Sequence, residues 1–198
     1  MGFKLLLEAS ADIEVVAEAD SGEVACQLLG SVAPDVVVMD IAMAGMGGIE
    51  AIKRLLAKNP RLRILALSAH EDTTHPRRAL QAGALGYLSK RSAPEVLIDA
   101  IRCIAKGQRY LDAQIAMRMA VQDTGGGYSP IEKLSAREFE VFVQLARGQS
   151  VLQIAQALKL SSSTVGTHLY NIKQKLGLAN QAEMTLLAVR HGLMDVPS

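Results

Sequence analysis

The sequence contains no tryptophan, only two cysteines and very few aromatic residues. Aromatic side chains make up 4% of the 198 residues, so the core must be aliphatic, and the apolar fraction of 49% is large enough to build one. Cys26 and Cys103 lack metal-site spacing and lie in apolar helical patterns, which predicts buried free thiols in a reducing cytoplasm. The composition argues against a disulfide-stapled secreted domain.

A long hydrophobic run and a strong net charge are also missing. No segment reaches the ~18 consecutive apolar residues of a membrane-spanning helix, and Glu8 interrupts the short apolar stretch near the start. The formal net charge is +1, and the residues from 131 onward carry seven basic and five acidic side chains. Because that excess is small, a role in nucleic-acid binding has to be argued from motifs rather than from charge.

Strand and helix patterns alternate through the first two thirds of the chain. Residues 36–40 place four apolar residues before an aspartate, which predicts a strand buried on both faces. Such alternation predicts an α/β domain with a parallel sheet and helices on both of its faces. The predicted strands are 13–19, 36–40, 63–68 and 86–90, and the predicted helices are 2–9, 22–29, 49–58, 76–82, 93–106 and 110–121.

Three of the predicted strands end in polar residues, Asp40, Ser68 and Lys90. Because the carboxyl ends of parallel strands lie on one edge of a sheet, we expect these side chains to converge. A carboxylate beside a hydroxyl and an ammonium group suits a nucleophile that accepts a phosphoryl group, whose oxygens the other two groups would bind. Taken singly, each residue also has an ordinary explanation as a cap, a turn or a solvated strand end.

These residues carry a resemblance to a known family. Residues 13–106 resemble the receiver domain of bacterial two-component response regulators, through VVVMDIAM around Asp40, LALSA around Ser68 and AGALGYLSK ending on Lys90. The resemblance implies a flavodoxin-like fold in which Asp40 is the phosphoacceptor. It also implies that Ser68 and Lys90 contact the phosphoryl group and that Tyr87 changes rotamer on activation.

The resemblance further implies a magnesium ion held by Asp40 and the carbonyl of Ala42, together with two acidic residues on a preceding strand. That strand and its acidic pair are absent, because residues 1–7 match the latter half of the family's first helix. We therefore expect a receiver truncated at its amino end, with a poor ligand set for Mg²⁺ and poor phosphorylation of Asp40. A smaller departure is Ala44, where the family often has proline.

A change of composition marks the domain boundary. Residues 122–130 include three consecutive glycines, a serine and a proline, which is typical of a flexible linker. The predicted organisation is a receiver domain at 1–121, a linker at 122–130 and an all-α four-helix domain at 131–198.

The last domain contains only helical patterns, in the order typical of a helix-turn-helix. Ser135 and Glu138 have the spacing of a capping box at the start of its first helix. The third predicted helix, 164–176, turns apolar residues inward and leaves polar and basic side chains that suit base edges or phosphates, although a solvated helix face would look the same. The candidate DNA-binding residues are Ser163, Thr164, Thr167, His168, Asn171, Lys173 and Lys175.

This domain carries a second resemblance. Residues 134–193 resemble the LuxR-type helix-turn-helix of NarL/FixJ-class regulators, through LSAREFEVF, the Ile154-Ala155 pair, SSTVGTH and KLGL. The resemblance implies that the final helix, residues 182–191, forms a homodimer that binds an inverted repeat in double-stranded DNA. Gly166 replaces a lysine usual in the family, which removes a phosphate contact and lowers helix stability by about 1 kcal/mol relative to alanine.

A receiver, a linker and a helix-turn-helix in this order predict a cytoplasmic transcriptional response regulator whose Asp40 is phosphorylated by a sensor histidine kinase. An alternative is a DNA-binding regulator that acts without phosphorylation because its receiver is truncated or degenerate. A third hypothesis is an α/β enzyme, since residues 45–48 read Gly-Met-Gly-Gly, but they lack the spacing and the following Lys-Ser/Thr of a phosphate-binding loop. We therefore predict a regulator and not an enzyme.

Overall fold

The chain forms two compact units. The computed structural model describes residues 2–43, 45–69, 72–123 and 130–194. The first unit comprises Met1–Glu71 and His75–Met117, and the second comprises Asp72–Thr74 and Arg118–Ser198. The division falls close to the predicted end of the first domain, and each unit is described below by itself.

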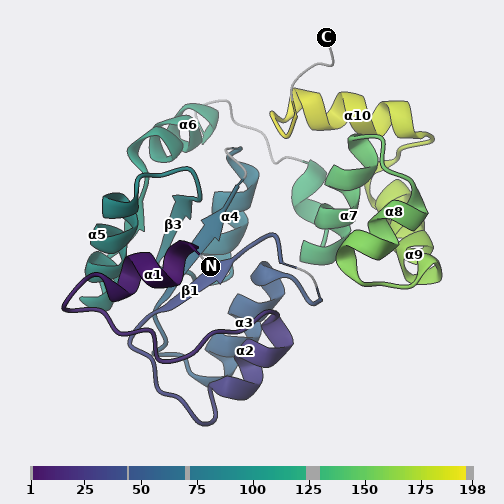
Figure 1. Ribbon diagram of the computed structural model, residues 1–198. Helices are drawn as coiled ribbons and strands as arrows, with labels where there is room; N and C mark the ends of the chain where they lie inside the picture. Colours follow the sequence, from purple (N-terminus) through teal and green to yellow (C-terminus); the bar gives the residue numbers. More distant parts are fainter. Residues whose placement is uncertain (1, 44, 70–71, 124–129, 195–198) are drawn as a thin grey trace. The chain divides into compact units, whose positions relative to one another are not determined.

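The first unit is built on a parallel sheet of four strands in the order β1-β2-β3-β4. The strands are β1 (Val37–Asp40), β2 (Ile64–Ser68), β3 (Gly86–Ser89) and β4 (Tyr110–Leu111). β1, β2 and β3 lie in predicted strands, whereas β4 occupies two residues that were predicted to begin a helix. Every residue of β2 is buried, because a strand lies on each side of it and helices cover both faces of the sheet (Figure 1). The sheet confirms the predicted α/β class.

The prediction of a strand at 13–19 is wrong, since these residues form no strand in the structure. Their sequence has the propensity for a strand, but a strand also needs a neighbour to satisfy its backbone hydrogen bonds. β1 lies at the edge of the described sheet, and Val38 is 36% exposed. The prediction that this strand is buried on both faces is therefore also wrong.

Helices cover both faces of the sheet (Figure 1). Leu6 and Leu7 of α1 are partly buried and pack against the core that Leu97 and Ile101 of α5 form with β2 and β3, so α1 and α5 cover one face. Figure 1 shows α2 and α3 on the other side of the sheet from α5. The helices are α1 (Gly2–Glu8), α2 (Gly22–Leu28), α3 (Gly48–Lys58), α4 (Thr74–Gln81) and α5 (Pro94–Ala105).

The segment that joins the two units begins with a helix. α6 runs over Ala113–Asp123, so the first two residues of the predicted linker are helical and the prediction is wrong for them. Residues 124–129 of that linker, like Ala44, lie outside the described residues. The next described element is η1, a short 3-10 helix at Pro130–Lys133.

The second unit is helical, as predicted. Its helices are α7 (Ala136–Ala146), α8 (Val151–Leu158), α9 (Ser162–Leu176) and α10 (Gln181–Arg190). The capping box of Ser135 and Glu138 is confirmed at the start of α7. A second box, formed by Ser150 and Gln153, starts α8 earlier than the predicted apolar positions indicated.

One aliphatic and aromatic core holds these helices together. Phe139 and Phe142 of α7, Ile154 of α8 and Val165 and Ile172 of α9 are all buried in it. None of the described helices is long and apolar enough to span a membrane.

Candidate functional sites

The side chains of Asp40 and Lys90 meet at the carboxyl ends of β1 and β3. The Lys90 Nζ donates to Asp40 Oδ2 at 2.5 Å, and the backbone N–H of Ala42 donates to Asp40 Oδ1 at 3.0 Å. The Asp40 side chain is 35% exposed and the Lys90 side chain is 31% exposed. Asp40 is therefore a solvent-accessible carboxylate with a cation held against it, and the predicted convergence of these two residues is confirmed.

Ser68 and Tyr87 are buried beside the same edge of the sheet. Ser68 ends β2, one residue beyond Leu67, the residue paired with Asp40. Tyr87 lies within β3 and pairs with Ala66 of β2. Both are 0% exposed. The strand register thus brings Ser68 to the sheet edge that bears Asp40, while the Tyr87 side chain occupies an interior position.

The loop after β1 is shaped by three glycines. Gly45 and Gly47 have φ values of 80° and 75°, a left-handed region that disfavours other residues. A Cβ on Gly48 would lie 2.2 Å from the carbonyl oxygen of Asp40, so only glycine allows α3 to begin this close to the strand end. The path of the loop therefore accounts for the glycines that had suggested a phosphate-binding loop.

The ligands available for Mg²⁺ around Asp40 are few. Asp20 and Asp40 line the same cavity, but both Asp40 oxygens already accept hydrogen bonds, from Lys90 and Ala42. Among the residues that the structure describes, no three His, Cys, Asp or Glu side chains are grouped as a metal site would require. Mg²⁺ prefers near-octahedral oxygen coordination, which this donor set does not supply, so the residues present do not fit the ion.

The second candidate site is the outward face of α9. Ser163, Thr164 and Thr167 of the predicted set are exposed there. Tyr170 was missed by the sequence analysis, although it follows Ser163 and Thr167 at helical spacing and is 63% exposed. Its position after two predicted contact residues was the signal that could have identified it. These side chains form a polar surface with one aromatic ring.

His168 and Asn171 lie at the border of this face, and both are half-buried. The Nδ1 atom of His168 is buried and has no hydrogen-bond partner among the described residues. Burial lowers the pKa of this imidazole, which favours its neutral form. His168 is consequently less available to a ligand than the exposed hydroxyls beside it.

The two predicted lysines are engaged within the domain. Lys175 Nζ donates to Glu138 Oε2 at 2.6 Å, and the Glu138 side chain is 5% exposed against 41% for Lys175. Lys173 Nζ donates to the carbonyl of Ala179 at 2.8 Å. The Lys175 contact therefore joins the end of α9 to α7, and the Lys173 contact joins α9 to the turn that follows it, which the sequence did not predict.

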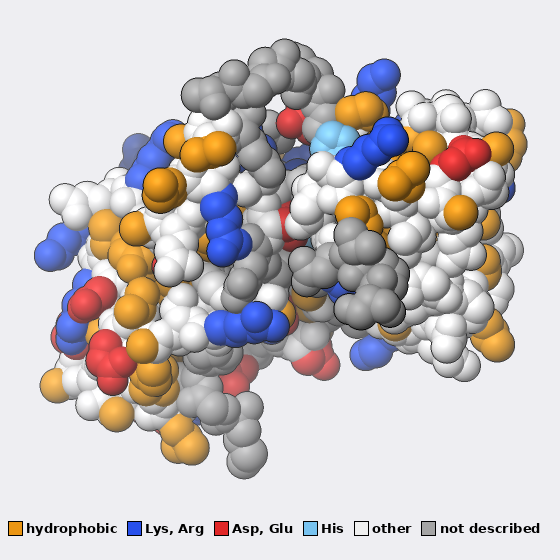
Figure 2. Space-filling view, turned by 90° about the horizontal axis from the view of Figure 1, so that it is seen from above, with side chains coloured by type: hydrophobic (Ala, Val, Ile, Leu, Met, Phe, Trp, Pro, Cys, Tyr) orange, Lys and Arg blue, Asp and Glu red, His pale blue; other side chains and the backbone are white. Residues whose placement is uncertain are grey.

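The surface charge is dispersed on the face that Figure 2 presents. Lys and Arg side chains stand there singly or in small groups among polar and apolar ones, without a single large basic patch among the described residues (Figure 2). This distribution agrees with the formal net charge of +1.

Both units match known protein families. Residues 1–102 match the response regulator receiver domain, and residues 132–188 match the bacterial regulatory proteins of the luxR family. The first match spans the Asp40 site, and the second contains α7, α8, α9 and most of α10.

Similar proteins share both units. The chain is 38% identical over 199 residues to response regulator GacA of Pseudomonas aeruginosa, covering 100% of this chain and 93% of that protein. It is 39% identical over 196 residues to response regulator UvrY of Escherichia coli, covering 98% and 90%. A solved structure of RcsB from Salmonella enterica serovar Typhimurium, bound to promoter rprA with the phosphomimetic BeF3−, is 25% identical, with a TM-score of 0.62 and coverage of 94% and 90%.

Proposed function

The chain belongs to the two-component response regulators with a receiver domain and a LuxR-type helix-turn-helix, and we propose that phosphorylation of Asp40 controls its binding to DNA. The observation that carries the proposal is the contact of Lys90 Nζ with Asp40 Oδ2 at 2.5 Å. This contact holds a cation beside an accessible carboxylate, where a transferred phosphoryl group would need its charge balanced.

The proposed step is a phosphoryl transfer to Asp40. A carboxylate oxygen attacks phosphorus, and the bond from phosphorus to the nitrogen of a phosphohistidine on a sensor kinase breaks. The electron pair leaves with the imidazole, and an acyl phosphate remains on Asp40. Lys90 would then neutralise one phosphoryl oxygen and Ser68 would donate a hydrogen bond to another.

A conformational change would follow from the added charge. The new phosphoryl group would compete with Asp40 for Lys90. Ser68 is fully buried, so it would have to move to donate a hydrogen bond to the phosphoryl group. Tyr87 lies on the neighbouring strand and would change rotamer as Ser68 moves. We propose that this repacking is the signal passed to the DNA-binding unit.

The DNA-binding surface in this proposal is the outward face of α9 on double-stranded DNA. Ser163, Thr164, Thr167 and Tyr170 are its exposed side chains and would read base edges or contact the backbone. His168, Asn171, Lys173 and Lys175 flank them. We propose that α10 pairs two copies of the chain, since Leu186 on this helix is 52% exposed while Met184 and Ala188 face the core.

We propose domain limits of 1–121 for the receiver and 131–198 for the DNA-binding domain, with the linker between them. The family matches at 1–102 and 132–188 support these limits. The helix α6 ends at Asp123, so the first two residues of this linker, 122 and 123, are helical.

The test is labelling with acetyl phosphate in Mg²⁺, followed on phosphate-affinity gels and by intact mass. Asp40→Asn is the matched control, because it keeps the shape of the side chain and removes the nucleophile. The proposal expects a hydroxylamine-labile phosphate on the unaltered chain alone, and a change in its affinity for a duplex obtained by pooled selection. Labelling that persists in Asp40→Asn would contradict the assignment.

A second function is favoured by the ligand set around Asp40. Because the described residues do not fit Mg²⁺, the charge that develops in phosphoryl transfer lacks metal stabilisation. The chain would then bind DNA constitutively, with a receiver unit that is not phosphorylated. No labelling together with salt-sensitive DNA binding would favour this function, and efficient Mg²⁺-dependent labelling would reject it.

A further inference from the structure

One side of α9 carries a row of exposed residues without charge. They recur at helical spacing and are Ser163, Thr167, Tyr170 and Gln174. We call this row the uncharged stripe. Guanine is most often recognised in the major groove by the paired donors of an arginine or by a lysine. Because the stripe has neither side chain, it suits other features of the base edges.

The hydroxyl group of Thr167 is turned towards the helix backbone. Its Oγ1 donates to the carbonyl oxygen of Ser163 at 3.1 Å, a bond that threonine often makes to the preceding turn of a helix. Because this bond holds Oγ1 against the helix, the methyl group presents most of the exposed surface of the side chain. Thr167 therefore offers an apolar contact, although it is a polar residue.

The hydroxyl groups at the start of α9 bond to one another. Ser161 Oγ lies 2.8 Å from Ser163 Oγ and 2.7 Å from Thr164 Oγ1. It also accepts a hydrogen bond from the backbone N–H of Thr164 at 3.0 Å, which caps the helix. These hydroxyls thus stabilise the first turn of α9, and the apolar part of the outward face begins one turn later, at Thr167.

Gly166 and Tyr170 continue the apolar surface. The Tyr170 side chain is 63% exposed, and Gly166 lies one helical turn before it. A Cβ on Gly166 would meet no atom within 4 Å, and this glycine does not have a positive φ. Glycine is less favourable than alanine inside a helix, yet neither packing within the described residues nor backbone conformation requires it here. It leaves a space beside Thr167 and Tyr170 that a group from another molecule can enter.

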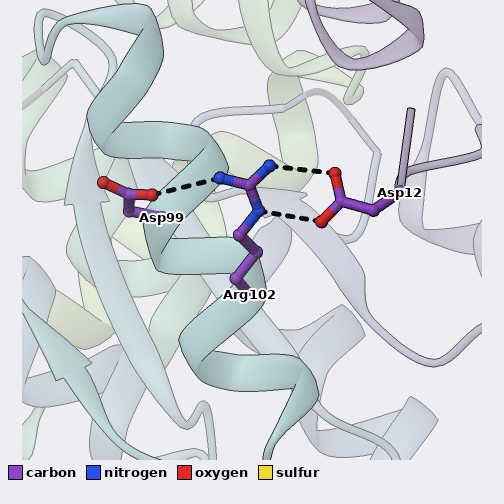
Figure 3. Close-up of polar contacts among 3 residues, drawn as sticks. All are labelled: Asp12, Asp99 and Arg102. Carbon is purple, nitrogen blue, oxygen red and sulfur yellow. Dashed lines mark hydrogen bonds and ion pairs between the residues drawn. The ribbon is translucent and has the colours of Figure 1, made fainter. Parts of the chain in front are cut away.

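Exposed helix surfaces elsewhere in the chain hold paired charges. On α5, Arg102 donates from Nε and Nη2 to the two oxygens of Asp12, at 2.9 Å each, and from Nη1 to Asp99 at 3.4 Å (Figure 3). Removal of charged groups from water costs much more free energy than removal of hydroxyl, methyl or aromatic groups. The uncharged stripe of α9 can therefore be dehydrated against a ligand at a lower cost than the surface around Arg102.

We propose that Gly166, Thr167 and Tyr170 bind the 5-methyl groups of thymine in the major groove and so determine sequence specificity. The inference rests on the proposed function of α9 as the helix that contacts DNA. The 5-methyl group is the apolar feature of the major groove, and threonine methyl groups and aromatic rings are suited to contact it. Thr167 and Tyr170 are ~4.5 Å apart along the helix axis, close to the ~3.4 Å between successive bases of a strand. This spacing fits two neighbouring thymines.

The experiment compares duplexes that contain thymine or deoxyuridine at the same position. Deoxyuridine keeps the O4 acceptor and the pairing with adenine, and it lacks only the 5-methyl group. The duplex is obtained by pooled selection with the full chain, its thymines are replaced one at a time, and affinity is measured by fluorescence anisotropy at a fixed salt concentration. We expect replacement at two neighbouring positions of each half-site to weaken binding about fourfold each, as for the loss of one buried methyl group.

Two variants of Thr167 separate its methyl group from its hydroxyl group. Thr167→Ser removes the methyl group and keeps the hydroxyl, whereas Thr167→Val keeps a methyl group and is the matched control. Thr167→Ser should bind the thymine duplex about fourfold more weakly and should no longer respond to deoxyuridine at one of the two positions. Thr167→Val should still distinguish thymine from deoxyuridine about fourfold at both positions.

Gly166→Ala tests the space beside these residues. The added methyl group meets no atom of the folded chain, so a loss of DNA affinity with an undiminished unfolding temperature cannot be attributed to misfolding. We expect Gly166→Ala to weaken binding to the thymine duplex about tenfold, because two methyl groups would occupy the same space. The loss should be smaller on a duplex with deoxyuridine at the contacted positions, where one of the two methyl groups is absent.

Three results would overturn the proposal. Equal affinity for thymine and deoxyuridine at every position would reject recognition of methyl groups and leave DNA binding by the chain intact. An equal response to deoxyuridine in Thr167→Ser and in the unaltered chain would remove Thr167 from the contact. Failure of the chain to bind any duplex in the selection would reject the proposed DNA-binding function as well, so the two failures can be told apart.

Discussion

Replacement of Lys175 by alanine should lower the free energy of unfolding of the DNA-binding unit. We do not expect it to remove a phosphate contact. The ammonium group lies 2.6 Å from Glu138 Oε2, and the Glu138 side chain is 5% exposed. Loss of one partner of a buried ion pair costs about 3–5 kcal/mol, whereas an exposed pair contributes about 0–1 kcal/mol. Lys175 is 41% exposed and the Ser135 N–H still bonds Glu138 at 2.7 Å, so we expect roughly 1–2 kcal/mol.

The assay is native-state hydrogen exchange of buried α7 amides, such as Val141 and Phe142, in the full chain. A double-mutant cycle with Glu138→Gln separates the pair from its surroundings, since glutamine can still close the capping box as Gln153 does in α8. The cycle should give a coupling free energy of about 1 kcal/mol. DNA titrations at several salt concentrations then give the slope of log affinity against log salt for each variant.

The same pair predicts a dependence of stability on pH. Burial acts to raise the pKa of Glu138, but hydrogen bonds from Lys175 and Ser135 outweigh it and hold this pKa below the usual 4.5. A lowered folded pKa gives stability that is present above pH 4.5 and is lost as the pH falls through the folded value. Glu138→Gln should therefore lose less stability than the unaltered chain over that acidic range.

Two results would refute this reasoning. Unchanged exchange of the α7 amides in Lys175→Ala would show that the ion pair does not stabilise the unit. A fall of about one in the slope of log affinity against log salt would identify Lys175 as a phosphate contact instead. The structural role predicts weaker DNA binding with an unchanged slope.

Three further substitutions have defined outcomes. Gly166→Ala should stabilise the second unit by about 1 kcal/mol in hydrogen exchange, because a Cβ there meets no atom within 4 Å and glycine is unfavourable inside α9; no gain would mean that the helix is strained at this position. Gly48→Ala should destabilise the first unit by about 1–3 kcal/mol in thermal unfolding, since its Cβ would lie 2.2 Å from the Asp40 carbonyl oxygen. Tyr170→Ala should lower DNA affinity at least about tenfold with unchanged unfolding, because its ring is 63% exposed; unchanged affinity would remove it from the interface.

The polar ends of the strands could be predicted because they follow from a local rule. Any parallel strand places its last residue at the same edge of the sheet, so the sequence was sufficient to bring Asp40 and Lys90 together. The start of a helix could also be predicted where a side chain caps the first turn of that helix, as Ser135 does for α7. The partner of Lys175 could not be found in this way, because Glu138 lies on another helix, 37 positions earlier in the chain.

The sequence by itself determined the alternation of strands and helices, the order of the two units and the polar ends of β1, β2 and β3. These features depend on neighbours within a few residues, which the chain carries with it wherever it folds. Only the tertiary structure decided that residues 13–19 form no strand and that Val38 is 36% exposed at a sheet edge. Local propensity favours an extended backbone, but a strand exists only where another strand accepts its hydrogen bonds.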